Sequence, residues 1–256
     1  MSSLDAYFAR IGYRGGGLAA LHEAHASTIP FENLAIQMGE PIALDLPSLL
    51  RKLVARHRGG YCFEQNLLLR AALEHLGTKV TVCEARVRAN ATRLLPRTHL
   101  TLLVDAEGQR QLCDVGFGGE GLLLPVPLDG AAHAQPGGTY RVSREGELLV
   151  LQSETAAGWT DLYALAPAPT FAPDWEMANW FTSTHPQSKF VTTLTAQLPT
   201  RAARHVLRGL TYTRIADGAA TTRELARAEL VPFLRVTFGL ELPSDAQFRA
   251  LDGCGC

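Results

Sequence analysis

The strongest constraint on the fold is a change in the spacing of apolar residues after Gly77. Before it, apolar residues recur every three to four positions over 18–27, 46–57 and 63–77, and each segment stops at or just before a proline or glycine. From residue 78 the runs are short, rich in β-branched and aromatic residues, and alternate as in strands. Helices followed by strands predict an α+β fold rather than a doubly wound parallel sheet.

The later part of the chain predicts a β-meander or barrel and then a small mixed α/β region. Turn-like residues separate the strand-like runs, and DAEG at 105–108 predicts a hairpin loop. Near the C-terminus, Thr221 and Glu224 have the spacing of a capping box, which predicts that a helix begins there.

Composition excludes several classes of function. The 46% of hydrophobic and 19% of charged residues are typical of a globular protein, and 24 Lys and Arg balance 25 Asp and Glu. The chain therefore has no large net charge that would attract nucleic acid or an anionic membrane. No apolar run has the ~20 residues of a membrane span. We expect a cytoplasmic protein. Five scattered cysteines indicate reduced thiols, and we expect Cys254 and Cys256 to lie in a frayed tail.

One cysteine stands where a nucleophile could be presented. In RGGYCFEQN, at 58–66, two glycines allow a sharp turn directly before Cys62, and a predicted helix begins directly after it. The free N–H groups and the dipole at a helix N-terminus favour an anion, so this position favours a thiolate.

The predicted hairpin supplies two partners for that thiol. If 105–108 closes the hairpin, Val104 lies opposite Gln109, and the same register puts His99 directly opposite Asp114 with their Cβ atoms about 5 Å apart. A carboxylate at that distance can fix the tautomer of an imidazole. The inference depends on the turn, because a loop shorter by one residue would place the two side chains on opposite faces.

Cys62, His99 and Asp114 have other possible roles. A lone cysteine, histidine or aspartate is more often a structural residue. A metal site that adds Cys113 to the three residues is a weaker rival, because Cys113 should point to the opposite face from Asp114.

Two motifs resemble known functional signatures, but the residues around each of them argue against that function. GFGGEG at 116–121 matches a dinucleotide fingerprint, but Pro125 and Pro127 exclude the helix that should follow it. His22 and His25 resemble a zinc-protease motif but are three residues apart instead of four, so we expect them to face solvent on a helix.

Five segments together resemble the arylamine N-acetyltransferases. They are IPFENL at 29–34, RGGYCFEQN at 58–66, THLTLLV at 98–104, DVGFGG at 114–119 and NWFTSTHPQSKF at 179–190. The resemblance implies a helical bundle over 1–80, an antiparallel β-barrel over 81–188 and an α/β lid over 189–256, around a cysteine-protease-like Cys-His-Asp core.

The resemblance also implies a reaction, namely ping-pong acetyl transfer from acetyl-CoA to an arylamine, an arylhydrazine or an arylhydroxylamine. In it Cys62 is the acetylated nucleophile, His99 its base and Asp114 the residue that orients His99, while Arg58 and Glu32 pair near the site. We expect substrate or cofactor contacts from the following residues: Thr98, Phe117, Gly118, Ser188 and Lys189.

The expected partners are acetyl-CoA as a co-substrate and a small aromatic amine, with no permanently bound cofactor, no metal, no nucleic acid and no membrane. We expect a monomer or a homodimer. Three alternatives remain: an amide synthase that closes a polyketide macrolactam on the same scaffold, a cysteine hydrolase with the same three residues, and a non-enzymatic scaffold.

Overall fold

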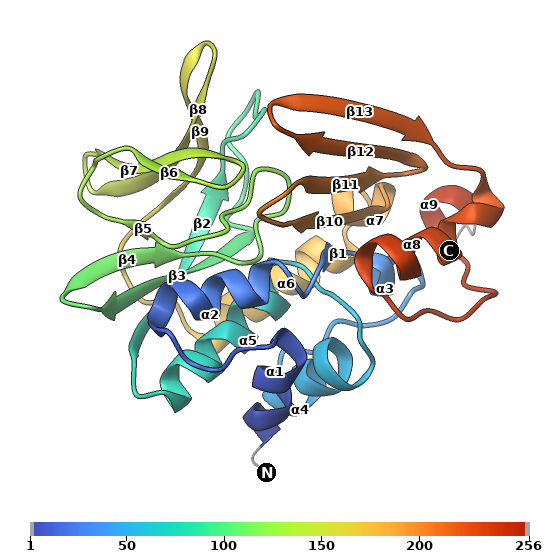
Figure 1. Cartoon of the computed structure of the whole chain (residues 1–256), viewed down its shortest axis with the longest axis horizontal. Coiled ribbons are helices and arrows are strands. Elements are labelled where there is room, and N and C mark those ends of the chain that lie inside the picture. Colours follow the sequence, from blue (N-terminus) through green and yellow to red (C-terminus); the bar gives the residue numbers. More distant parts are fainter. Residues whose placement is uncertain (1–2, 254–256) are drawn as a thin grey trace.

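The computed structural model describes residues 3–253, so the expected tail with Cys254 and Cys256 lies outside the described residues. Helices dominate the N-terminal part and strands the remainder (Figure 1). The helical segments are α1 (Ser3–Ile11), α2 (Gly17–Ala26), α3 (Leu34–Gln37), α4 (Leu46–Leu49), the π-helix η1 (Leu50–Ala55), α5 (Cys62–His75), α6 (Ala172–Thr184), α7 (Lys189–Thr192), the 3-10 helix η2 (Arg227–Glu229), α8 (Leu230–Phe238) and α9 (Arg249–Asp252).

An eight-stranded antiparallel sheet forms the middle of the chain. Its strands follow the order β5-β4-β3-β2-β9-β8-β7-β6, and β5 lies close to β7, so the sheet is nearly closed like a barrel. Their bounds are β2 (Lys79–Val87), β3 (His99–Ala106), β4 (Gln109–Cys113), β5 (Val126–Pro127), β6 (His133–Gln135), β7 (Gly138–Glu145), β8 (Leu148–Thr155) and β9 (Gly158–Leu165). Alternating side chains from these strands fill its interior, among them Leu103, Leu112, Val142, Leu151 and Tyr163.

A second antiparallel sheet of five strands occupies the C-terminal part, beside α8 and α3 in Figure 1. Its order is β1-β10-β11-β12-β13, with bounds β1 (Phe31–Glu32), β10 (Thr195–Pro199), β11 (Arg204–Arg208), β12 (Thr211–Ala216) and β13 (Ala219–Glu224). Strand β1 comes from the N-terminal part and pairs with β10, so a segment of the predicted helical part joins the last sheet. The boundaries at residues 80 and 188 stay predictions.

Helix α5 connects the helical part to the barrel-like sheet. It contacts β2 and β3, and ten of its fourteen residues are buried. A surface helix buries one apolar stripe, whereas this helix is covered on nearly all sides. Its N-terminus is therefore held at the junction between the helices and the strands.

The hairpin between β3 and β4 differs from its predicted register. Ala106 pairs with Gln109, and the turn is formed by Glu107 and Gly108 alone, with φ of 55° and 77°. Positive φ at both positions is typical of a two-residue type I′ turn, which fits the right-handed twist of the strands. The predicted four-residue loop was wrong, and each strand residue pairs two positions further along than expected. A shift of two keeps the same face.

The predicted capping box at Thr221 and Glu224 was also wrong. Both residues lie in β13, where they pair with Arg214 and Thr211 of β12. The helix begins later, and the side chain of Glu229 accepts the backbone N–H of Ala226. Pairing across the sheet therefore outweighs the local signal.

Within residues 3–253, none of the helices is both long and apolar enough to cross a membrane.

Candidate active site

Cys62 is the first residue of α5, and the segment before it passes very close to other backbone. A Cβ on Gly59 would lie 2.1 Å from the carbonyl oxygen of Pro30, so only glycine fits there. The side chain of Glu64 accepts the backbone N–H of Tyr61 at 3.2 Å and so caps the helix start. Cys62 is 3% exposed, at a helix N-terminus that favours an anion.

One buried and one partly buried ion pair hold this turn. Arg58 donates to Glu32 at 3.2 Å, and Lys52 donates to Glu64 at 2.6 Å. Although burial opposes the change, Arg58 and Lys52 lower the pKa of Glu32, which also accepts the backbone N–H of Gly59. Burial raises the pKa of Glu64 despite Lys52. Arg58 and Glu32 thus pair next to the turn that precedes Cys62.

His99 and Asp114 meet at the end of the hairpin. His99 opens β3, and Asp114 follows the last residue of β4. With the observed register they are diagonal rather than direct neighbours, yet Nε2 of His99 lies 2.6 Å from Oδ2 of Asp114. The shared face predicted from the sequence survives the error in register because that error was two residues.

The second oxygen of Asp114 is bound from two other sides. Asn66 of α5 donates to Oδ1 at 2.9 Å, and so does the backbone N–H of Gly116. Burial alone would raise the pKa of Asp114, but His99, Asn66 and Gly116 lower it below its ordinary value. The carboxylate therefore stays ionised inside the protein and orients its other oxygen to His99.

The same pairing makes His99 a base in a buried position. Burial disfavours the imidazolium, but the Asp114 charge, the hydrogen bond to it and interactions with Cys62 raise the pKa of His99 to about 10. The rings of Phe117 and Tyr163 lie 5.2 Å and 4.7 Å from the His99 ring, which is 3% exposed. A thiol, a protonatable imidazole and a fixed carboxylate are thus gathered at one place.

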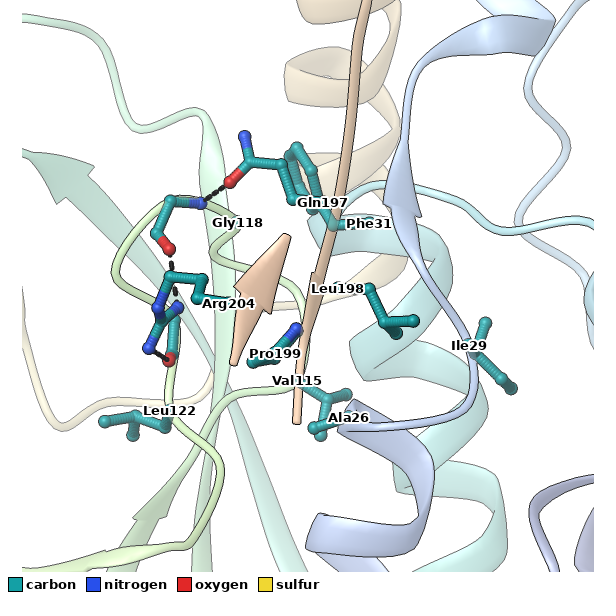
Figure 2. A pocket seen from close by; sticks show the side chains of 12 residues that line it. Ala26, Ile29, Phe31, Val115, Gly118, Leu122, Gln197, Leu198, Pro199 and Arg204 are labelled. Carbon is teal, nitrogen blue, oxygen red and sulfur yellow. Dashed lines mark hydrogen bonds between the residues drawn. The ribbon is translucent and has the colours of Figure 1, made fainter. Parts of the chain in front are cut away.

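The glycine-rich loop at 116–121 packs against Cys62. A Cβ on Gly116 would lie 2.6 Å from the Cα of Cys62. On its other side the loop is bound to the C-terminal sheet: Gln197 accepts the N–H of Gly119, and Arg204 donates to the carbonyls of Gly119 and Gly121. Figure 2 shows Gln197 and Arg204 next to the loop at Gly118. The loop lines a small pocket with Phe31, Gln197 and Arg204.

The expected contact residues occupy different places. The carbonyl oxygen of Thr98 lies 3.7 Å from Sγ of Cys62, and Phe117 lies edge-on to His99. Gly118 has φ of +70° and lies against the ring of Phe31.

Ser188 is buried, caps α7 and donates to the Thr182 carbonyl at 2.5 Å, while Lys189 is exposed. Thr98 and Phe117 therefore adjoin the three central side chains, and Ser188 has its hydroxyl engaged within the protein.

The expectation that His22 and His25 face solvent was wrong. Both are fully buried on α2. His22 lies between the backbone N–H of Asp114 and the carbonyl of Leu123, and His25 between the Tyr7 hydroxyl and Gln65. Burial lowers the pKa of His22 to about 4 and that of His25 to about 3.

Asn66 is a second residue that the sequence interpretation missed. It has a signal in the sequence, because position 66 is four residues after Cys62 and hence on the same face of the helix. Its side chain donates to Asp114 and to the Leu100 carbonyl and accepts the N–H of Val115. A polar residue on the helix face that carries Cys62 could have indicated this role.

Cys62, Cys83 and Cys113 are free thiols in the structure. Within the described part of the chain, no group of three or more His, Cys, Asp and Glu side chains has an arrangement that could hold a metal ion.

Comparison with known proteins gives one consistent answer. The N-acetyltransferase family model matches residues 16–247. An arylamine N-acetyltransferase of Mycolicibacterium smegmatis is 38% identical over 253 residues, which cover 93% of this chain and 92% of the relative.

Solved structures agree. The arylamine N-acetyltransferase of M. tuberculosis superposes with a TM-score of 0.90 at 38% identity over 98% of both chains. That of Mycobacterium marinum in complex with CoA superposes with a TM-score of 0.87 at 35% identity over 93% of this chain and 92% of the other.

Proposed function

The chain belongs to the arylamine N-acetyltransferase family of acyltransferases, and from that premise we propose that it moves the acetyl group of acetyl-CoA to the nitrogen of an arylamine. Arylhydrazines and arylhydroxylamines are further acceptors. The observation that carries the proposal is the buried contact between His99 and Asp114, at 2.6 Å, beside a cysteine at a helix N-terminus. The CoA complex of the M. marinum relative supports acetyl-CoA as the co-substrate.

The first half-reaction forms a thioester on the protein. Because Nε2 of His99 faces Asp114, the other ring nitrogen is free to take the proton of Cys62. The thiolate attacks the thioester carbonyl of acetyl-CoA, and the imidazolium returns the proton to the departing CoA sulfur. The backbone N–H of Cys62 is one donor for the oxyanion. The products are acetyl-Cys62 and free CoA.

The second half-reaction forms the amide. The amine attacks the acetyl carbonyl of acetyl-Cys62, His99 takes the proton that the nitrogen loses, and the Cys62 thiolate leaves. Asp114 keeps its charge throughout and holds the imidazole in one tautomer. Arg58 and Glu32 fix the turn that carries the nucleophile and take no part in proton transfer.

We assign residues to the two substrates from where they lie relative to Cys62, His99 and Asp114. Thr98 and Phe117 adjoin the three reacting side chains, and we assign them to the acetyl group and the amine. Gly118 follows Phe117 and lies against Phe31, and we assign its backbone to the same substrates. Lys189 is exposed and carries a positive charge, so it suits a CoA phosphate, with Ser188 next to it holding the backbone of α7. Lys189→Ala should raise KM for acetyl-CoA several-fold at unchanged kcat for a saturating donor; an unchanged KM would remove Lys189 from the site.

Mass spectrometry of the intact protein tests the mechanism. We expect acetyl-CoA alone to add one acetyl group to the wild type and to Cys83→Ala, a variant of another buried cysteine, and none to Cys62→Ala. Addition of an arylamine should remove the group and yield the amide.

Two other results would contradict the proposal. Steady release of CoA without amine would indicate a hydrolase. Neither adduct nor CoA release would favour the amide synthase alternative.

A further inference from the structure

His22, one of two buried histidines on α2, has no part in the reaction steps. It nevertheless contacts Asp114, the residue that orients the base. His22 accepts the backbone N–H of Asp114 at 3.0 Å with Nε2, and its Nδ1 lies 3.0 Å from the carbonyl oxygen of Leu123. A backbone N–H can only donate and a carbonyl can only accept. These two partners therefore fix one form of the ring, neutral, with the proton on Nδ1.

Asp114 needs such a partner because it lies beyond the sheet. The ladder between β3 and β4 ends at the pair Leu102 and Cys113, so sheet pairing does not hold the backbone N–H of the next residue. That N–H is buried and would remain unsatisfied without His22. The side chain of Asp114 is bound separately, by His99, Asn66 and Gly116.

Helix α2 offers a rigid base for this contact. Its buried face includes Leu18, Leu21 and Ala26, which belong to the same apolar cluster as the start of α5. An imidazole held by two backbone groups and by packing has one orientation. A displacement of Asp114 by a fraction of an ångström would lengthen its 2.6 Å contact with His99.

We propose that His22 is a positioning residue for acetyl transfer: its unprotonated Nε2 holds the backbone of Asp114 and so sets where the carboxylate faces His99. The inference rests on the proposed function, since it concerns the same side chains. His22 touches neither substrate nor the reacting atoms. It acts through Asp114.

The readout is the pKa of His99, because it depends directly on the Asp114 contact. The titratable groups that face His99 are Asp114, which follows β4, Cys62 on α5 and Tyr163 on β9, whose ring lies 4.7 Å from that of His99. Those that face His22 are Asp114, Glu23 and His25. Only Asp114 belongs to both sets, so a change at His22 reaches His99 through it.

Two amide variants separate positioning from packing. In His22→Gln the longer side chain can place an oxygen near the position of Nε2 and accept the N–H of Asp114. In His22→Asn the amide reaches only the position of Nδ1, so it keeps Leu123 and loses Asp114. We expect His22→Asn to lower the pKa of His99 by about 1 and the acetylation rate of Cys62 about tenfold, with His22→Gln near wild type.

Tyr7→Phe is the matched control. It also deletes one buried hydrogen bond on α2, from the Tyr7 hydroxyl to His25 at 2.7 Å, without touching Asp114. We expect a lower Tm with the wild-type pKa of His99. His22→Leu removes both contacts, and if it does not fold, the comparison of Gln with Asn decides alone.

Titration of His99 by ¹⁵N-histidine NMR, together with the rate of Cys62 acetylation by acetyl-CoA, gives the answer. Equal His99 pKa values in His22→Gln, His22→Asn and wild type would overturn the positioning role, even if Tm fell. If acetyl-CoA leaves wild-type Cys62 unmodified while His22→Asn still lowers the pKa of His99, the proposed function fails and the positioning of Asp114 stands.

Discussion

Helix α2 and strand β3 each bury a histidine against Asp114, and the two rings behave in opposite ways. His22 contacts the backbone N–H of Asp114, and burial lowers its pKa to about 4. His99 is also buried but contacts the carboxylate, and its pKa is raised to about 10. Equal burial of the same residue type thus gives one neutral anchor and one strong base. The charge of the partner decides which, and the two roles are specified by different atoms of one aspartate.

The largest expected effect comes from removing that charge. Asp114→Asn keeps the shape of the side chain but leaves burial as the main influence on His99, so its pKa should fall below 6.5, as that of His22 does. An amide can also hold the imidazole in the wrong tautomer, and we expect acetyl transfer to fall about a thousandfold or more. Rapid-mixing measurement of Cys62 acetylation and NMR titration of His99 check this. A His99 pKa that stays near 10 in Asp114→Asn would show that the carboxylate is not its cause.

A smaller effect concerns stability in mild acid. The pKa values of His22 and His25 are lowered from 6.5 to about 4 and about 3, so between these values the unfolded chain binds more protons than the folded one. The unfolding free energy must therefore fall as the pH drops through 6.5, and each histidine should cost about 2 kcal/mol by pH 5. The raised pKa of His99 has the opposite sign: its contribution is complete below 6.5 and is lost as the pH rises through 10.

Urea unfolding of wild type and His25→Gln at pH 7.5 and pH 5 measures the contribution of His25 to this pH dependence. Glutamine does not titrate, so the variant should lose about 2 kcal/mol less than wild type between the two conditions. Glu64 works in the opposite sense because its pKa is raised, but it is unchanged in both proteins and cancels in the difference. An equal loss in both proteins would mean that His25 is not a buried neutral group in solution.

Local sequence was sufficient to place Cys62 at a helix start and His99 and Asp114 on one face of the hairpin. Two glycines before Cys62 and the apolar run after it mark a helix start, and the hairpin keeps His99 and Asp114 on one face whether the loop has two or four residues. The arrangement of helices, barrel-like sheet and C-terminal sheet followed from the change in apolar spacing and from the family motifs.

The contacts of His22 could not be predicted in that way. Its partners Asp114 and Leu123 are 92 and 101 residues away in sequence, and no spacing rule on α2 connects them. The same holds for Thr221 and Glu224, whose capping-box spacing was overruled by pairing with β12. A polar residue on a helix is assigned to solvent by default, and only the packed structure shows which polar residue is buried with a partner.

The smallest expected effect comes from a His–Asp pair outside the core. His133 Nε2 lies 2.9 Å from Oδ1 of Asp129, close to the distance between His99 and Asp114, but the two side chains are 31% and 48% exposed. The hydrogen bond from His133 and the N–H of Ala131 lower the pKa of Asp129. Water and salt screen an exposed pair, so Asp129→Asn should change the unfolding free energy by under about 1 kcal/mol and leave acetyl transfer unchanged. Thermal unfolding at low and high salt, beside Asp114→Asn, measures the difference. If Asp129→Asn lowered the unfolding free energy and acetyl transfer as much as Asp114→Asn, burial would not be what distinguishes the His99–Asp114 pair from the His133–Asp129 pair.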